Sequence, residues 1–166
     1  AALLAEHEVK LGVLTHYDAT ADFESRLELA AQTIEVATTA QINASGRGYL
    51  GGLREGITAA GRTLGNVEGA TSYSGGAHGG LGGEDGGATN GIYGVPFRPA
   101  ALGSGGSAGG SGRTGGDGGG WIVLNAETLA VDGVVSADGL SGSGFSAGSG
   151  AGGSIFIVAD TLSGSG

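Results

Sequence analysis

The sequence predicts an all-β fold: a glycine-rich parallel β-solenoid-like domain with polyproline-II-type glycine helices packed alongside. Three observations lead to this prediction. Segments of alternating apolar and polar residues recur along the chain, 40 of the 166 residues are glycine, and one long tract carries glycine at every third position. Only two prolines and no sustained G-X-Y repeat argue against collagen, and recurrent Val, Ile and Leu runs argue against disorder of the whole chain.

The first observation is an internal repeat with three copies. In each copy an alternating apolar run is followed by Ala, a polar residue and Thr, and then by Ile34, Leu129 or Leu162. The first two copies continue into a second short strand, and the first needs two extra residues around Thr38 and Thr39. A unit with one small apolar face gains stability by stacking on its neighbours, which predicts a solenoid. The copies are residues 26–48, 121–142 and 154–166.

The second observation is the distribution of glycine. Only Gly12 lies in the first 45 residues, whereas the remaining chain is rich in glycine. The predicted organisation is therefore an N-terminal strand or cap segment over 1–24 and a glycine-rich solenoid-like domain over 25–166. The alternation of Val9, Leu11 and Val13 predicts a strand in the first part.

The third observation is the glycine period of three, which matches the three residues per turn of a polyproline-II helix. It predicts packed glycine-helix tracts at about 75–91 and 103–120, with Trp121 lying over the glycine surface as an anchor. A flexible Gly/Ser linker is the alternative interpretation of the same composition. The glycines predicted to face a packed neighbour are Gly103, Gly106, Gly109, Gly112, Gly115 and Gly118.

Charge and composition exclude several classes of function. The formal net charge is −9 with a single lysine, so no basic stripe is available for nucleic acid. No run of 18 apolar residues occurs, and membrane insertion is not expected. The chain has no cysteine, which removes thiol chemistry and disulfides.

We expect neither an enzyme nor a cofactor site. The three histidines, His7, His16 and His78, have no nucleophile or metal-ligand pattern near them in the sequence. The G-x-G-x-x-G match at 46–51 is not followed by the long amphipathic helix that a dinucleotide-binding turn requires, because Gly56 and Gly61 interrupt it.

Metal binding and modification each have a few candidates. The segment "GGLGGED" approaches the calcium-binding nonapeptide but does not recur, so no metal site is predicted and Glu84, Asp85 and Asp117 are the only calcium candidates. Asn43 lies in an N-x-S sequence, the acceptor for N-glycosylation.

The segments "GRGYLGG", "SYSGGAHGGLGG", "YGVPFRPAALGSGG" and "GGGWIVLNAETLAVDGVVSADG" resemble the glycine-rich β-solenoid repeats of large secreted or surface-exposed bacterial proteins, including adhesin-like ones. The resemblance covers roughly residues 25–166. It implies an extracellular or cell-surface location and a structural role, and it implies no particular activity.

The expected function is that of a non-enzymatic extracellular structural module. It would serve as a self-associating building block of a surface fibre or filament, or as a spacer repeat of a giant surface protein, with copies of itself or neighbouring repeats as partners. The physical reason is that both ends of a stack of strands expose unpaired edges. The alternative is an adhesin-type domain that recognises glycan or another surface through Tyr73, Tyr93, Phe97 and Arg98. Ice binding is a third hypothesis, although the Thr residues show no regular ladder in the sequence.

Overall fold

A computed structural model describes residues 7–9 and 12–166, and it contains three sheets. The first is parallel and four-stranded in the order β1-β3-β7-β9, the second is parallel and three-stranded in the order β2-β4-β8, and β5 and β6 form an antiparallel pair. Two single 3₁₀ turns, Arg54–Gly56 and Gly110–Gly112, complete the regular structure of this part of the chain. The strands are β1 (His7–Val9), β2 (Gly12–Leu14), β3 (Leu27–Val36), β4 (Ala40–Asn43), β5 (Arg62–Thr63), β6 (Val67–Glu68), β7 (Trp121–Val131), β8 (Val134–Ser136) and β9 (Ser154–Ser163).

The strand pairing confirms the alignment of the three repeats. Ile34 pairs with Leu129, which pairs with Leu162, so equivalent repeat positions lie next to one another in adjacent strands. The two extra residues of the first repeat form the turn at Thr38 and Thr39 between β3 and β4. After this turn the pairing of β4 with β8 resumes two residues out of step with the pairing of β3 with β7.

The long strands β3, β7 and β9 share a break in the alternation of inward and outward residues. In β3, Leu29 and Ile34 both point to the core although five positions separate them, because Gln32 and Thr33 both point outward. The equivalent outward pair is Glu127 and Thr128 in β7. The break therefore falls at the same level in successive strands, and each strand turns a corner there.

The main hydrophobic core lies between the four-stranded and three-stranded sheets. Ile34, Ile42, Leu124 and Leu129 are fully buried in it. Burial of an aliphatic side chain of this size stabilises a fold by roughly 1.5–3 kcal/mol. The core is only one layer of side chains thick, so a core side chain is covered only where a strand of the facing sheet lies opposite it.

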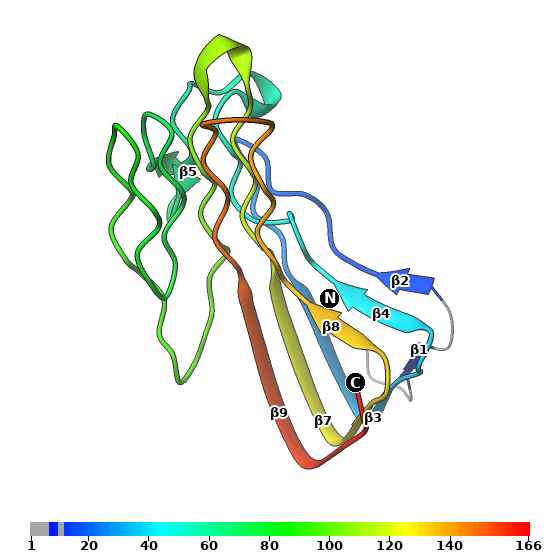
Figure 1. The fold of residues 1–166 in the computed structure, drawn as a ribbon. Helices are drawn as coiled ribbons and strands as arrows, with labels where there is room; N and C mark the ends of the chain where they lie inside the picture. The colour runs from blue at the N-terminus through cyan, green and yellow to red at the C-terminus, as the bar shows by residue number, and fades with distance from the viewer. Residues whose placement is uncertain (1–6, 10–11) are drawn as a thin grey trace.

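The glycine-rich half of the molecule continues the strands end to end and forms a second, nearly side-chain-free interior (Figure 1). Residues 102–108 and 115–120 are buried without interruption. The backbone N–H groups of the 115–120 segment donate to different neighbouring segments in turn. Gly115 and Gly118 donate to the 49–52 segment, whereas Gly116 and Gly119 donate to the 148–151 segment. A period of three thus lets each segment bond to neighbours on several sides.

The 103–120 tract is not one continuous segment. The turn at Gly110–Gly112 reverses the chain, so that 103–109 and 114–120 lie side by side and Gly106 donates to the carbonyl of Gly116. Gly112 has φ +73° and an added Cβ would meet nothing within 4 Å. Gly112 is therefore a turn glycine, and the prediction that it faces a packed neighbour is wrong.

The predicted fold class is also wrong. A parallel β-solenoid repeats one coil without interruption, whereas this chain has separate four-stranded, three-stranded and two-stranded sheets, and residues 44–120 lie outside both parallel sheets. The glycine tracts do not lie alongside strand coils as predicted. They pack mainly on one another, because backbones without side chains approach closely enough to satisfy their hydrogen bonds mutually.

Candidate self-association surface

Paired residues of β3, β7 and β9 form rows that face the core, and these rows become exposed to solvent at β9. Along one row the exposed fraction of the residue is 0% at Ile34, 0% at Leu129 and 65% at Leu162. The row that contains buried Leu124 ends in the same way at Ile157, which is 38% exposed. Side chains that belong to core positions are therefore open to solvent on the last strand.

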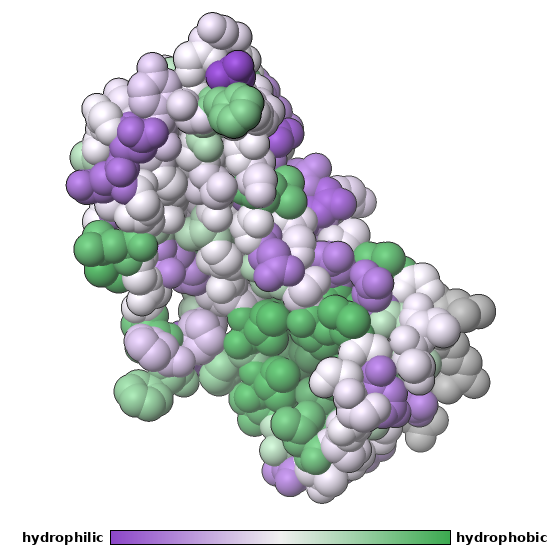
Figure 2. Space-filling model, viewed as in Figure 1, coloured by the Kyte–Doolittle hydropathy of each residue, from purple (hydrophilic) through white to green (hydrophobic). Residues whose placement is uncertain are grey.

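The cause is the unequal number of strands in the two sheets. The four-stranded sheet extends to β9, but the three-stranded sheet that faces it ends at β8. No described strand lies opposite β9. Figure 2 shows the result as a group of hydrophobic residues gathered over β9 and toward β8.

The outer edge of β9 adds unpaired backbone groups to this surface. β9 pairs with β7 on one side and, within the described residues, with no strand on the other. Its outward-facing Val158 is 47% exposed, so apolar side chains flank the edge on both faces. A long apolar edge of this kind is a template for pairing with another strand.

The two edge strands of the three-stranded sheet, β2 and β8, also expose apolar residues. Leu14, Ile42 and Val135 form one inward row, in which Ile42 is fully buried and the two ends are half-buried. On the outer face, Val13 and Val134 flank Gln41 and are 61% and 50% exposed. The stack therefore has an apolar residue at each end of each of these rows.

The sequence predicted unpaired edges at the ends of the stacked strands but did not locate this surface. The third repeat, residues 154–166, contains the long strand β9. Ile155, Ile157 and Leu162 are exposed on this strand, and the sequence-based candidates did not include them.

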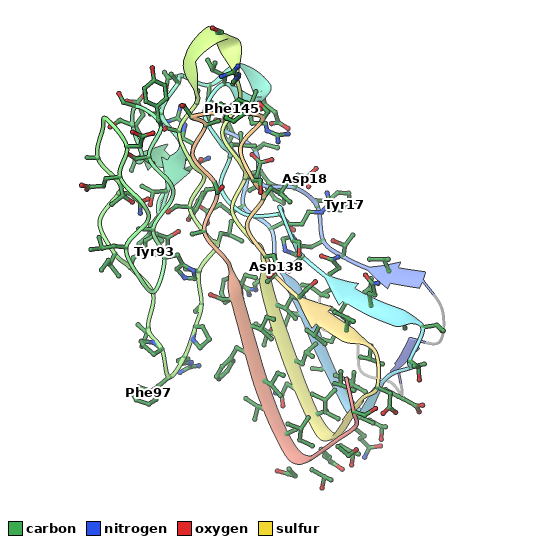
Figure 3. All side chains as sticks on the ribbon, viewed as in Figure 1. Tyr17, Asp18, Tyr93, Phe97, Asp138 and Phe145 are labelled. Carbon is green, nitrogen blue, oxygen red and sulfur yellow. The ribbon has the colours of Figure 1, made fainter. Side chains whose placement is uncertain are left out.

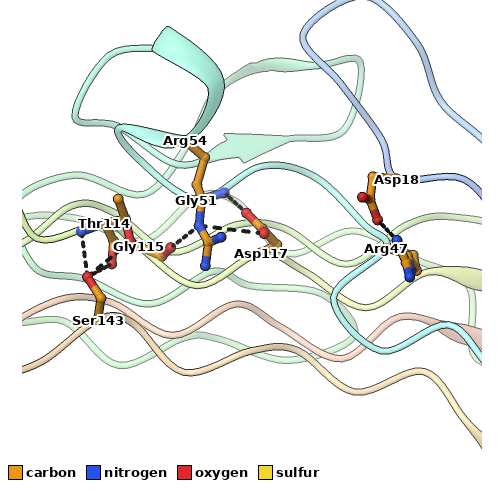
Figure 4. A network of polar contacts seen from close by, with 8 residues as sticks. All are labelled: Asp18, Arg47, Gly51, Arg54, Thr114, Gly115, Asp117 and Ser143. Carbon is orange, nitrogen blue, oxygen red and sulfur yellow. Dashed lines mark hydrogen bonds and ion pairs between the residues drawn. The ribbon is translucent and has the colours of Figure 1, made fainter.

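A polar network lies apart from this surface and joins glycine-rich segments (Figure 4). Asp117 accepts a hydrogen bond from the Gly51 N–H at 2.7 Å, and the Arg54 guanidinium lies 3.6 Å from its other oxygen. Burial raises the pKa of the Asp117 carboxyl, and the Gly51 N–H and Arg54 oppose that shift. Asp18 and Arg47 form a neighbouring ion pair.

The calcium candidates are not brought together. Glu84 and Asp85 are exposed, whereas Asp117 is buried and bonded to Gly51. No group of three or more acidic, histidine or cysteine side chains within the described residues has a geometry that could hold a metal ion.

The predicted binding-loop residues do not form one site. Phe97 is 95% exposed at the tip of a projecting loop, and Arg98 follows it (Figure 3). Tyr93 is used internally: its hydroxyl donates to the carbonyl of Leu102, and its ring lies 4.8 Å from that of His78. Burial raises the pKa of Tyr93 to about 12.

Tyr73 lies against a different part of the glycine-rich half. Its ring is near Gly86 and its hydroxyl is near Gly110. The predicted glycosylation acceptor Asn43 is half-buried in β4, where its side-chain oxygen accepts a hydrogen bond from the Ser45 N–H at 2.8 Å.

The predicted structural residues have varied surroundings. An added Cβ would lie within 2.3 Å of a backbone oxygen at Gly103, Gly106, Gly115 and Gly118 and 2.9 Å from one at Gly109. Trp121, which begins β7, packs against Tyr49 and Leu102, and the Arg26 guanidinium lies 4.8 Å from its ring centre.

Two of the three histidines have structural hydrogen bonds. His16 is buried, with Nδ1 2.8 Å from the Tyr17 carbonyl and Nε2 accepting from the Trp121 N–H at 3.3 Å. His78 Nδ1 lies 2.8 Å from the Gly152 carbonyl. His7 belongs to β1, and its side chain lies outside the described part of the structure, as does Leu11.

No family model, curated protein or solved structure gave a match to this chain. Among the described residues, no helix has the length and apolar character needed to cross a membrane.

Proposed function

We propose that this chain is a non-enzymatic structural module whose copies associate through the uncovered end formed by β9 and β8. The observation that carries the proposal is the loss of cover along the core rows, most clearly from Leu129 to Leu162. In this function the module is a building block of an extracellular or cell-surface fibre, or a spacer in a larger surface protein.

Two physical terms favour association at this end. Covering the exposed aliphatic side chains removes apolar surface from water, which stabilises an interface by roughly 25 cal/mol per Å² before the costs of association. Pairing the free edge of β9 adds backbone hydrogen bonds with defined direction. Together they give both affinity and a fixed orientation of the partner.

The non-enzymatic part of the proposal is supported by the use of the chemically capable side chains within the fold. His16 links the Thr15–Asp18 segment to the start of β7, and Asp117 joins two glycine-rich segments. The adhesin alternative has less support because Tyr73 and Tyr93 contact different parts of the molecule and only the Phe97 loop projects.

The test replaces Ile157 and Leu162 with lysine and measures the size distribution by sedimentation velocity and negative-stain microscopy. Both side chains are substantially exposed, so the monomer should retain its melting temperature within a few degrees while assembly is lost. The matched control is Leu81→Lys, because Leu81 is 73% exposed on the glycine-rich half and should not affect assembly. A wild-type chain that stays monomeric at high concentration, or a double variant that assembles like wild type, would overturn the proposal.

A further inference from the structure

We propose that a groove on the outer face of the four-stranded sheet binds a sugar ring that carries one carboxylate. The groove lies between this sheet and residues 98–100, at the end of the projecting loop whose tip carries Phe97 (Figure 3), and its volume is about 260 Å³. Arg98 lines it, whereas the other predicted binding-loop residues, Tyr73, Tyr93 and Phe97, do not. The proposal does not depend on self-association.

The floor of the groove is a row of paired residues from three adjacent strands. Glu28 in β3 pairs with Val123 in β7, which pairs with Phe156 in β9. Because successive residues of a strand point to opposite faces, this row points away from the core that contains buried Ile122 and Leu124. Val123 and Phe156 are half-buried and present an apolar surface, on which the C–H face of a pyranose ring can pack.

The opposite wall of the groove is fixed to the start of β9. Ser154 is buried, and its hydroxyl donates to the Ala101 carbonyl at 2.7 Å and accepts from the Ala101 N–H at 3.3 Å. The Arg98 N–H donates to the Val95 carbonyl at 3.1 Å and so forms a turn within the loop. These bonds hold the wall in place before a ligand arrives, which lowers the cost of ordering it on binding.

The guanidinium of Arg98 is a cation that the fold does not use. Within residues 7–9 and 12–166 it has no hydrogen bond or ion pair and it is exposed beside the apolar floor. A guanidinium binds a carboxylate through two parallel N–H···O bonds. The groove therefore suits a ligand with a carboxylate on an apolar-faced ring. The arginines that do have a side-chain hydrogen bond or ion pair are Arg26, Arg47, Arg54, Arg62 and Arg113.

The ion pair of Arg26 and Glu28 indicates the rest of the ligand. The two groups are 3.1 Å apart and partly exposed, so guanidinium N–H groups and carboxylate oxygens remain available to ligand hydroxyls. Together with Arg98 they give the groove two positive charges and one negative charge, which match a single carboxylate. The net charge of −9 on the chain disfavours a ligand with many carboxylates, such as an acidic peptide.

Trp121 provides a signal for binding at this place. It lines the groove, and the Arg26 guanidinium lies 4.8 Å from the centre of its ring. It is also the only tryptophan of the chain. A ligand that contacts Arg26 changes the surroundings of the indole, so the intrinsic fluorescence of the protein reports on occupation of the groove.

Titration of the full-length chain with sodium glucuronate, and separately with sodium galacturonate, tests the proposal by Trp121 fluorescence and calorimetry. We expect saturable binding of at least one of the two sugars. Its methyl ester keeps the ring and the hydroxyls but has no charge, so it should bind at least about ten-fold more weakly.

Two variants connect the binding to Arg98. Arg98→Gln should weaken binding of the acidic sugar by at least about ten-fold and leave the melting temperature unchanged, because the guanidinium has no partner in the described part of the fold. The matched control is Arg113→Gln, since that guanidinium donates to the Phe145 carbonyl and does not line the groove. This control should bind the sugar like wild type.

The proposal is overturned if neither acidic sugar binds saturably, if the ester binds as tightly as the acid, or if Arg98→Gln retains wild-type affinity. Tighter binding of a glutamate-containing tripeptide than of either sugar would assign the groove to acidic peptides and would also overturn it. None of these results affects the sedimentation test of self-association.

Discussion

At the scale of single residues, the glycine-rich half depends on the absence of side chains at particular positions. An added Cβ on Gly118 would lie 1.9 Å from the Gly103 oxygen, closer than any real contact of this kind. An added Cβ on Gly80 would meet no atom within 4 Å, and Gly80 has no positive φ. The glycines therefore differ sharply in what they tolerate, although the sequence presents them alike.

Replacing Gly118 and Gly80 each with alanine should distinguish an effect of close backbone packing from a general effect of losing a glycine. We predict that Gly118→Ala lowers stability by roughly 3 kcal/mol, since two backbones must move apart, and lowers the melting temperature by roughly 6–12 °C. Gly80→Ala should be neutral or slightly stabilising because it restricts the unfolded chain. Thermal melting of the two variants measures the difference, and equal melting temperatures would contradict a packed glycine interior.

His16 should make stability depend on pH. Burial lowers the pKa of the imidazole below 6.5, only partly offset by the hydrogen bond to the Tyr17 carbonyl. Because the folded-state pKa is below the unfolded-state value, the contribution of neutral His16 is fully present above about pH 6.5 and is lost as the pH falls.

We therefore predict that wild type loses more thermal stability between about pH 8 and about pH 5 than the His16→Gln variant, which cannot titrate. Gln can still accept a hydrogen bond from the Trp121 N–H. Melting curves at several pH values provide the measurement. Parallel pH profiles for the two proteins would show that protonation of His16 is not coupled to folding.

At the scale of elements, Asp117 connects the 46–52 segment to the 114–120 segment. Removing its side chain leaves the Gly51 N–H buried without an acceptor, which costs about 1–3 kcal/mol. We predict that loss for Asp117→Ala and a smaller one for Asp117→Asn, because the amide oxygen can still accept the bond and no buried charge remains. Chemical denaturation of both variants gives the comparison. A loss for Asp117→Asn equal to that for Asp117→Ala would contradict this prediction and would mean that the carboxylate charge beside Arg54, rather than the bond from the Gly51 N–H, stabilises the fold.

The elements that the sequence predicts best are the long strands. Alternation and repeated Ala-polar-Thr triplets predicted that Ile34, Leu129 and Leu162 are equivalent, and the strand register confirms it. The prediction that these repeats form a solenoid was wrong, because a repeat in the sequence does not show which path the residues between two copies follow. Here they form a glycine-rich interior held by backbone hydrogen bonds, which leave no side-chain pattern in a sequence.

At the scale of the whole molecule, the two halves use different means of cohesion. One half buries aliphatic side chains between sheets, and the other buries backbone between glycine-rich segments (Figure 1). Composition could predict that both are present. It could not predict the uncovered end, because exposure of Ile157 and Leu162 depends on the number of strands in the facing sheet rather than on the residues themselves.

The most direct test of the account is residue-resolved hydrogen exchange of β9 in dilute and in assembled protein. In a parallel sheet, alternate N–H groups of β9 bond to β7 and the others face the free edge. We predict that the edge-facing amides exchange rapidly in the dilute protein and at least about ten-fold more slowly on assembly, while the amides bonded to β7 stay protected in both. Assembly that leaves the edge-facing amides of β9 as exchangeable as in the monomer would contradict association through this end.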